Sequence, residues 1–216
     1  MHRRRRTALT VSAALLVAAP LLAACGNEAH PGAAAVVGGE RIEVSTVQAK
    51  VKDVRTAQAS SPQSAQLIKD SGQLSRAKLY DLIVGQVVQR AADDADVKVS
   101  RKEIQDGLAV LEQQSGGQEQ LAAMYLEQRG VAPAQLNDAV RRDILVNKLA
   151  ASLGATNTPE GQATLNKAFT AAAKSLNIDV NPRYGTWDDQ KLELGSYKAP
   201  WITQVTKEPE PVEPGA

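Results

Sequence analysis

The segment 79–91 carries apolar side chains on a broad helical stripe, which limits what this chain can fold into. Its members recur at helical spacing: Leu79, Leu82, Ile83, Val87 and Ala91, widened by Tyr80 and Val88. Such periodicity predicts a helix, and a helix that is apolar over so much of its surface belongs at the centre of a domain. Aromatic residues are only 3% of the chain, so its core must consist mostly of Ala, Leu, Val and Ile, which favours helices.

The remaining helices are predicted from their start and stop signals. Ser100 and Glu103 have the spacing of a capping box, as have Ser45 and Gln48. Gly130 ends a helix over 118–129, since glycine is common just after a helix. We expect about six helices, beginning near Ser45, Ser75, Ser100, Gln118, Pro133 and Thr158. The stretch 60–72, rich in Ser, Pro and Gln, predicts a loop.

A small sheet completes the predicted fold. Two short apolar clusters, Val36-Val37 and 41–44, flank Gly38-Gly39, which indicates a tight hairpin. The only other strong strand candidate is 178–180. Because a lone hairpin is marginal, we expect this third strand to pair with it. The fold class is therefore mainly α, with a small sheet joining the N- and C-terminal ends of the domain.

The first residues have the pattern of an export signal. Four arginines lie in 1–6, an uncharged segment with an apolar centre follows over 7–24, and the small residues Ala23 and Ala24 close it. A basic start, an apolar middle and a small-residue cleavage site define a secretory signal. The alternative is a retained membrane anchor, which Pro20 and the small residues disfavour.

Cys25 is the only cysteine, so it has no partner for an intramolecular disulfide. The sequence Leu22-Ala23-Ala24-Cys25 resembles the lipobox of bacterial lipoproteins. That resemblance implies that 1–24 are removed and that the Cys25 thiol takes a diacylglycerol, with palmitate-type acyl chains. Two or more chains on one residue hold a protein stably at a membrane. The alternative is a secreted protein with a stray thiol.

These patterns predict four regions: a signal peptide over 1–24, lipidated Cys25 and a flexible tether to residue 34, a helical domain over 35–206, and a disordered tail over 207–216. Loss of four arginines with the signal leaves 21 basic and 24 acidic residues, a balance of −3. No basic stripe survives, which argues against a nucleic-acid partner.

The folded part offers little for catalysis. The two histidines are His2, in the signal, and His30, in the tether, so a Ser-His-Asp or Cys-His site cannot form in the domain. The acidic pairs Asp93-Asp94 and Asp188-Asp189 raise the question of a metal, but a solvated helix end and a polar turn explain them better. We expect no enzyme activity, no metal and no cofactor.

Two groups of residues are candidates for peptide binding. Leu121, Met124 and Tyr125, with Leu126, cover more than one face of a short helix, so one face belongs to the core and the other is free to bind. Methionine is adaptable in such surfaces. Four of the seven aromatic residues lie near the C-terminus: Tyr184, Trp187, Tyr197 and Trp201. The first two are expected to fasten this segment onto the helices. For Tyr197 and Trp201, fastening and peptide binding stay equally open.

The ordered segments resemble the N-terminal chaperone region of SurA- and PrsA-type exported foldases, which has a trigger-factor-like helical fold. The matching stretches are 36–51, 79–104, 115–149 and 178–188. In the family that this chain resembles, members with prolyl isomerase activity carry a parvulin domain, which is commonly inserted before the last helix of the chaperone region. Here Gly154 and Thr158, predicted to end one helix and cap the next, are four positions apart, so the insert is absent.

The resemblance implies a lipid-anchored holdase-type chaperone on the outer face of the bacterial plasma membrane. Its partners would be unfolded or newly exported polypeptides, and it would have no isomerase activity. The alternative is a lipoprotein that serves as a subunit or fixed partner of an envelope complex. A chaperone should delay aggregation of unrelated clients, whereas a dedicated subunit should co-purify with one partner.

Overall fold

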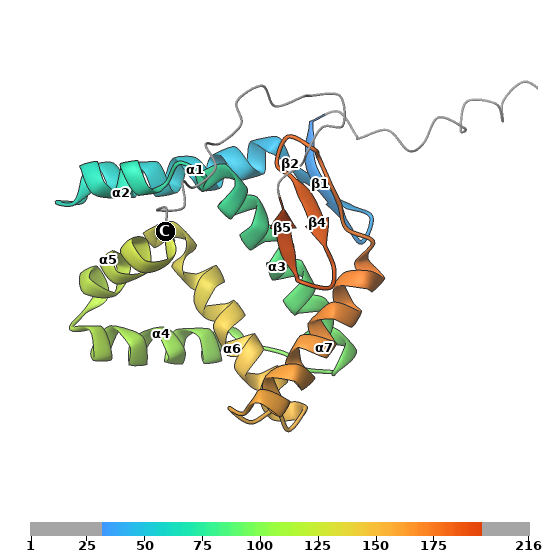
Figure 1. Cartoon of the computed structure of the whole chain (residues 1–216). Coiled ribbons are helices and arrows are strands. Elements are labelled where there is room, and N and C mark those ends of the chain that lie inside the picture. Colours follow the sequence, from blue (N-terminus) through green and yellow to red (C-terminus); the bar gives the residue numbers. More distant parts are fainter. Residues whose placement is uncertain (1–31, 196–216) are drawn as a thin grey trace, which may run out of the picture. The chain divides into compact units, whose positions relative to one another are not determined.

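The computed structural model describes residues 32–195 (Figure 1). The described residues contain seven α-helices: α1 (Val44–Ala59), α2 (Ser64–Asp70), α3 (Leu74–Asp94), α4 (Arg101–Ser115), α5 (Gln118–Arg129), α6 (Leu136–Ser152) and α7 (Pro159–Leu176). A 3-10 turn, Pro133–Gln135, leads into α6. The predicted mainly helical fold is confirmed, with one helix more than expected.

The small sheet is also confirmed. Strands β1 (Ala33–Val37), β2 (Glu40–Glu43) and β3 (Asp179–Val180) lie in the order β2-β1-β3, with both pairs antiparallel. Ala35 of β1 lies opposite Ile42 on one side and Val180 on the other. The N- and C-terminal ends of the domain are therefore paired, as the sequence predicted.

The predicted boundary of the tether is wrong by a few residues. Ala33 and Ala34, assigned to the tether, belong to β1, and Ala34 is fully buried. Asn181, which follows β3, holds Ala33 and Ala34 in place. Its side-chain amide donates to the Ala33 carbonyl at 3.1 Å, and its backbone N–H donates to the Ala34 carbonyl at 3.0 Å. Small side chains suggested a flexible segment, but here they allow the strand to pack closely.

Helix α3 lies at the centre of the main core. Leu79, Ile83, Val87 and Ala91 of its predicted stripe are all buried. They pack against residues from the sheet and from the helices on either side: Ala35, Val37, Val47, Leu149, Leu165, Ala172, Val180 and Tyr184. Helix α3 is therefore the element around which the sheet, α6 and α7 pack.

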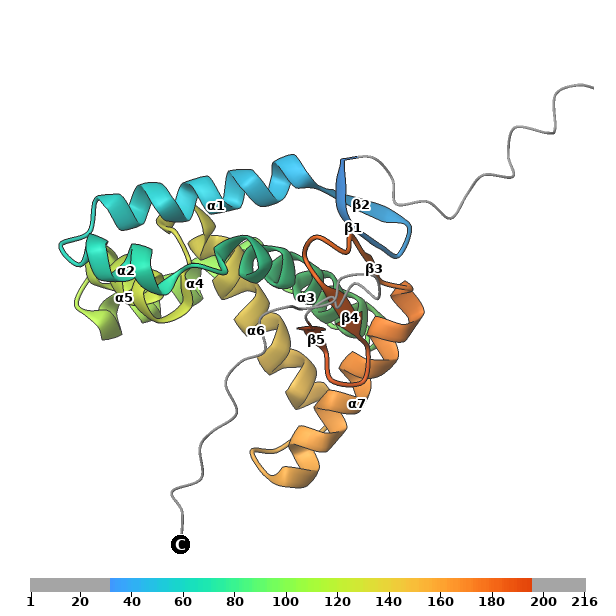
Figure 2. The ribbon, with the colours of Figure 1, turned by 45° about the horizontal axis from the view of Figure 1, so that its top comes forward.

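A satellite core joins α4, α5 and α6. Its buried members come from α5, α6 and the turn between them: Leu121, Tyr125, Val131, Leu136, Ala139 and Val140. Helix α4 contributes only half-buried side chains to it, Leu108 and Leu111. In Figure 2, α4 and α5 lie together on the side of the molecule away from the sheet and α7. The main core and this satellite core therefore stabilise different halves of the domain.

The ends of the helices show which of the local start and stop signals in the sequence are enough to fix a helix boundary. The box of Ser100 and Glu103 forms as predicted, and Gly130 ends α5 in a left-handed conformation with φ 58°. The box at Ser45 does not form: α1 begins one residue earlier, with Glu43 as N-cap. The N–H of Val44 instead bonds to the Gly32 carbonyl at 2.8 Å. Strand pairing therefore sets the start of α1 and leaves Ser45 inside its first turn.

The predicted loop over 60–72 is wrong, because α2 lies within it. Side chains of α1 satisfy the C-terminal end of this short helix. The Arg55 guanidinium donates to the Ser71 hydroxyl at 2.7 Å and to the Ser71 carbonyl at 3.1 Å. Buried Gln58 donates to the Leu67 carbonyl at 3.2 Å. These bonds add to the local cap, in which the Ser71 hydroxyl donates to the Leu67 carbonyl at 2.7 Å.

A second hairpin, also missed, closes the domain. It consists of β4 (Thr186–Asp188) and β5 (Glu193–Gly195). Tyr184 is buried in the main core, and the Trp187 ring lies 6.2 Å from that of Tyr80 on α3. Arg76 of α3 donates to the β5 carbonyls of Leu194 and Gly195 at 2.7 and 3.0 Å. The prediction that Tyr184 and Trp187 fasten this segment to the helices is confirmed.

The acidic pairs have the structural roles that the sequence favoured. Asp93 and Asp94 accept from Gln89 and Arg90 one turn earlier in α3. Asp188 accepts from two backbone N–H groups of the β4–β5 turn. Within the described residues, no cluster of three or more His, Cys, Asp or Glu side chains is arranged to hold a metal ion.

No helix in 32–195 combines the length and the apolar composition needed to cross a bilayer.

The six residues 153–158 connect α6 directly to α7.

The N-terminus of α4 is fixed to α6 by a charged contact that should depend on pH. Lys148 of α6 donates to the Glu103 carboxylate at 2.5 Å, and the Ser100 backbone donates to it at 2.8 Å. The Lys148 bond, followed by those from Ser100, lowers the pKa of Glu103 from 4.5 to about 2. Because the folded pKa lies below the unfolded one, this stabilisation is complete above about pH 5 and is lost as pH falls toward 2.

We therefore expect Glu103→Gln to lower the melting temperature at pH 7 and to lose this effect near pH 2. Thermal melts of both proteins across this range measure the difference. Lys148→Gln should give the same pH dependence, since Lys148 is the largest cause of the shift. A Glu103→Gln difference that stayed constant down to pH 2 would contradict the assignment.

Candidate functional site

A cleft of about 800 Å³ lies between the C-terminal half of α1 and α5. In Figure 1, α1 and α2 run along one side of it and α5 along the other. The α1 wall contains Lys52, Asp53, Thr56 and Ala57, continued by the turn 60–63. The α5 wall contains Glu119, Ala122, Ala123, Leu126 and Glu127, continued by residues 132–134.

Helical spacing divides α5 into two faces. The cleft residues recur at three- and four-residue intervals, from Glu119 through Ala123 to Glu127, which places them on one face. Leu121 and Tyr125 lie on another face and are buried in the satellite core, with exposed fractions of 0% and 6%. The satellite core therefore fixes α5 from behind and leaves its small side chains toward the cleft.

The floor of the cleft is apolar. Leu126 and Ala132, which line it, belong to a third buried cluster with Val54 of α1 and Leu74 of α3. Ala57 packs half-buried against this cluster. The two walls are thus joined through a packed apolar base, which favours a preformed cleft.

The α1 wall is braced by α2. Arg55 and Gln58, which hold α2, flank the cleft residues Thr56 and Ala57 along α1, and helical spacing puts the two pairs on opposite sides of the helix. One side of this part of α1 therefore binds α2 and the other is left for the cleft. Hydroxyl groups from Thr56, Ser60 and Ser61 add hydrogen-bonding capacity to this wall.

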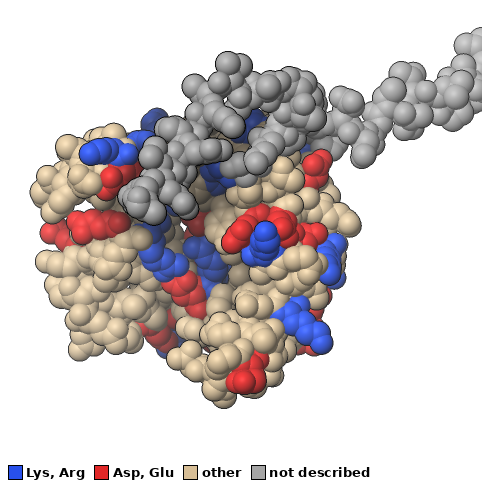
Figure 3. Space-filling model, in the orientation of Figure 1, with Lys and Arg blue, Asp and Glu red and all other residues tan. Residues whose placement is uncertain are grey.

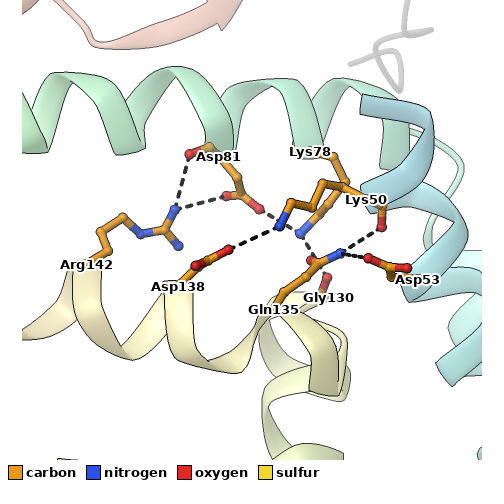
Figure 4. Close-up of polar contacts among 8 residues, drawn as sticks. All are labelled: Lys50, Asp53, Lys78, Asp81, Gly130, Gln135, Asp138 and Arg142. Carbon is orange, nitrogen blue, oxygen red and sulfur yellow. Dashed lines mark hydrogen bonds and ion pairs between the residues drawn. The ribbon is translucent and has the colours of Figure 1, made fainter. Parts of the chain in front are cut away.

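A polar network connects α1, α3 and α6 beside the cleft (Figure 4). Lys78 is buried, with 3% of its surface exposed, and donates to Asp81 at 2.7 Å and to the Gly130 carbonyl at 2.9 Å. Lys50 of α1 forms an ion pair with Asp138 of α6 at 3.1 Å. These contacts fix α6, and the turn after α5, against the other two helices.

Gln135 links this network to the cleft wall. Its side-chain amide donates to the Lys50 carbonyl at 2.9 Å and to the Asp53 carboxylate at 3.4 Å. Arg142 completes the network by donating to the Asp81 carbonyl at 3.3 Å. Figure 3 shows acidic and basic side chains side by side along the middle of this face. A smaller hollow of about 270 Å³ opens among these residues, but their charges are already paired.

The peptide-binding residues predicted from the sequence need correction. The prediction that Leu121 and Tyr125 bind peptide at the surface is wrong, because both side chains are buried in the satellite core. Tyr125 also carries Arg129 above its ring at 5.1 Å. Met124 is half-buried and packs against the same core. Tyr197, Trp201 and Cys25 lie outside the described residues, as does the predicted tail over 207–216, so those predictions stay untested.

The residues that do line the cleft were missed. Ala57, Ala122 and Ala123 are small and drew no attention beside the larger apolar residues of the same helices. The available signal was the helical spacing of Ala122 and Ala123 with Glu119 and Glu127 on α5. Thr56 and the turn 60–63 were missed because α1 was not recognised as a cleft wall.

Comparison with known protein families gives one match. Residues 1–150 match the family described as the SurA-like N-terminal domain. The matched stretch includes both cleft walls and ends within α6, before α7 and the closing strands. No curated protein and no solved structure matches the chain.

Proposed function

Since the chain belongs to the SurA-like N-terminal domain family, a chaperone-type family, we propose that it is a holdase that binds unfolded or newly exported polypeptides in the cleft between α1 and α5. In this proposal the protein acts outside the plasma membrane, and a lipid on Cys25 holds it to the outer face of that membrane. It binds and releases its clients without catalysing a reaction on them.

The cleft is the observation that supports this proposal most. It has the size of a ligand site, an apolar floor at Leu126 and Ala132, and polar groups along its walls. Pockets of several hundred Å³ with apolar lining and a few polar groups are typical binding sites. Its open walls of alanine and short hydroxyl side chains suit a range of client side chains better than one fixed ligand.

Binding in such a cleft should be weak and reversible. Covering about 400 Å² of apolar surface gives roughly 10 kcal/mol at about 25 cal/mol per Å². Association opposes this with a cost of about 4–15 kcal/mol. Affinities in the micromolar range or weaker follow, which suits a protein that must release its client.

Two assays on residues 26–216 test the function. At modest molar excess, the protein should slow aggregation of several unrelated unfolded proteins, and it should not accelerate isomerisation of a proline-containing peptide. Isomerase activity would overturn the non-catalytic part of the proposal. Failure with every client, together with stable co-purification of a single partner, would favour a dedicated subunit of an envelope complex.

The membrane anchor has its own prediction. Cys25→Ser should abolish lipid attachment and cleavage before residue 25, because the thiol is the lipid acceptor in the lipobox pattern that Leu22-Ala23-Ala24-Cys25 resembles. The variant should be mislocalised relative to the wild type. Intact-mass measurement of the wild-type membrane fraction gives the direct check: a mass that includes an unmodified Cys25 would overturn the anchor.

A further inference from the structure

The charges on the cleft walls are unbalanced. Of the residues that line it, one is basic, Lys52, and three are acidic, Asp53, Glu119 and Glu127. Asp53 accepts a hydrogen bond from Gln135. Glu119 and Glu127 are exposed, and neither has a hydrogen-bond or ion-pair partner among the described residues. Two unpaired carboxylates therefore face the space in which a client would lie.

The positions of these two carboxylates define a pattern. Glu119 and Glu127 lie eight residues apart on α5, which is about 12 Å along a helix that rises about 1.5 Å per residue. Between them the wall is small and apolar, at Ala122 and Ala123. The other wall includes Thr56 and Ala57. The α5 wall therefore has short side chains in its middle and a carboxylate beyond each end.

We propose that the cleft selects extended client segments in which one bulky apolar side chain lies between two basic residues about four positions apart. This inference rests on the proposed function and names its preferred client. In an extended segment, four residues span about 13 Å, which matches the separation of the two carboxylates. The apolar side chain would occupy the space between the alanines.

Lysine and arginine suit these positions for a second reason. Their aliphatic stems lie along apolar surface while the charged ends stay in water, so they can cover the alanines of α5 and still reach Glu119 or Glu127. Acidic clients would meet the same carboxylates with like charge. The cleft should therefore discriminate by charge while it tolerates different apolar residues.

The test uses two fluorescent peptides and residues 26–216. One peptide places a leucine between two lysines spaced as above, and the other has glutamates in place of both lysines. Fluorescence anisotropy should show that the lysine peptide binds about three- to tenfold more tightly, the combined effect of two exposed ion pairs. The difference should shrink at high salt because exposed charges are screened.

Variants assign this preference to the cleft. Glu119→Gln with Glu127→Gln should remove most of the difference, and Glu119→Lys with Glu127→Lys should reverse it in favour of the glutamate peptide. The matched control is Glu40→Lys with Glu160→Lys, which changes net charge equally at two exposed sites on β2 and α7 outside the cleft. The control should keep the wild-type preference.

The outcomes separate the two proposals. Equal binding of both peptides, or a preference that the control variant also reverses, would overturn the charge selectivity and leave the proposed function standing. Absence of binding to either peptide, with no protection of unfolded clients from aggregation, would overturn both.

Discussion

A chain that ends at Asn177 is expected to lose the cooperative fold of the whole domain. This truncation removes β3, which pairs with β1 beside the main core, and it removes Asn181, which holds Ala33 and Ala34. It also removes buried Tyr184. Loss of one large buried side chain costs about 3–5 kcal/mol, and a whole domain has only about 5–15 kcal/mol of stability.

Circular dichroism melts should therefore show a truncated protein that is unfolded or melts at least 10 °C lower, given about 2–4 °C per kcal/mol for a domain of this size. The matched control ends at Gly195 and should melt clearly higher than the chain that ends at Asn177, because it keeps β3, Asn181 and Tyr184. An unchanged melting temperature for the chain that ends at Asn177 would show that the β1–β3 pairing does not stabilise the domain.

The second large effect concerns Leu121. Its side chain is fully buried among Tyr125, Val131 and Val140, so Leu121→Ala should cost about 2–5 kcal/mol of unfolding free energy through lost burial and the cavity left behind. Urea denaturation measures this loss. The melting temperature should fall by about 5–15 °C.

Met124→Ala is the control for this prediction. Met124 lies on the same helix but is only half-buried, so its truncation should cost clearly less than that of Leu121. The contrary result is a Leu121→Ala protein with an unchanged free energy of unfolding and reduced client binding only. That result would support the sequence-based hypothesis that Leu121 is an exposed peptide-binding residue, and it would contradict its burial in the satellite core.

The parts of the fold predicted from sequence are those set by local chemistry. The apolar stripe of α3 is strong enough that burial follows from periodicity alone. Ser100 with Glu103, and Gly130 after α5, act within one helical turn and formed as expected. The paired ends were predictable because 178–180 was the only strong strand candidate left for the N-terminal hairpin.

The features that were missed depend on distant contacts. Helix α2 is short, and besides its own C-cap residue Ser71 it is held by Arg55 and Gln58 of α1, contacts that its own sequence does not show. The start of α1 is set by pairing between Val44 and Gly32, which overrides the signal at Ser45. Hairpin β4–β5 depends on Arg76 of α3 and has little strand character of its own.

The candidate site was harder to predict than the fold. The sequence drew attention to large apolar residues, but on α5 Leu121 and Tyr125 belong to the satellite core, while Ala122 and Ala123 line the cleft together with Leu126. Which face of a two-sided helix is covered depends on where α4 and α6 pack, and periodicity does not supply that information. The charge pattern of Glu119 and Glu127 gains meaning only once the opposite wall is known.

The central claim, that unfolded polypeptides bind in the cleft between α1 and α5, is tested most directly by site-specific crosslinking. A photo-reactive amino acid replaces Ala123 on the cleft wall in one protein and Ala163, an exposed alanine on α7, in another. Each protein is illuminated with several unrelated unfolded clients. We expect adducts with each client from position 123, few from position 163, and loss of the adducts once the client has folded. Equal adducts from both positions, or none from position 123 while the protein still protects clients from aggregation, would contradict the claim.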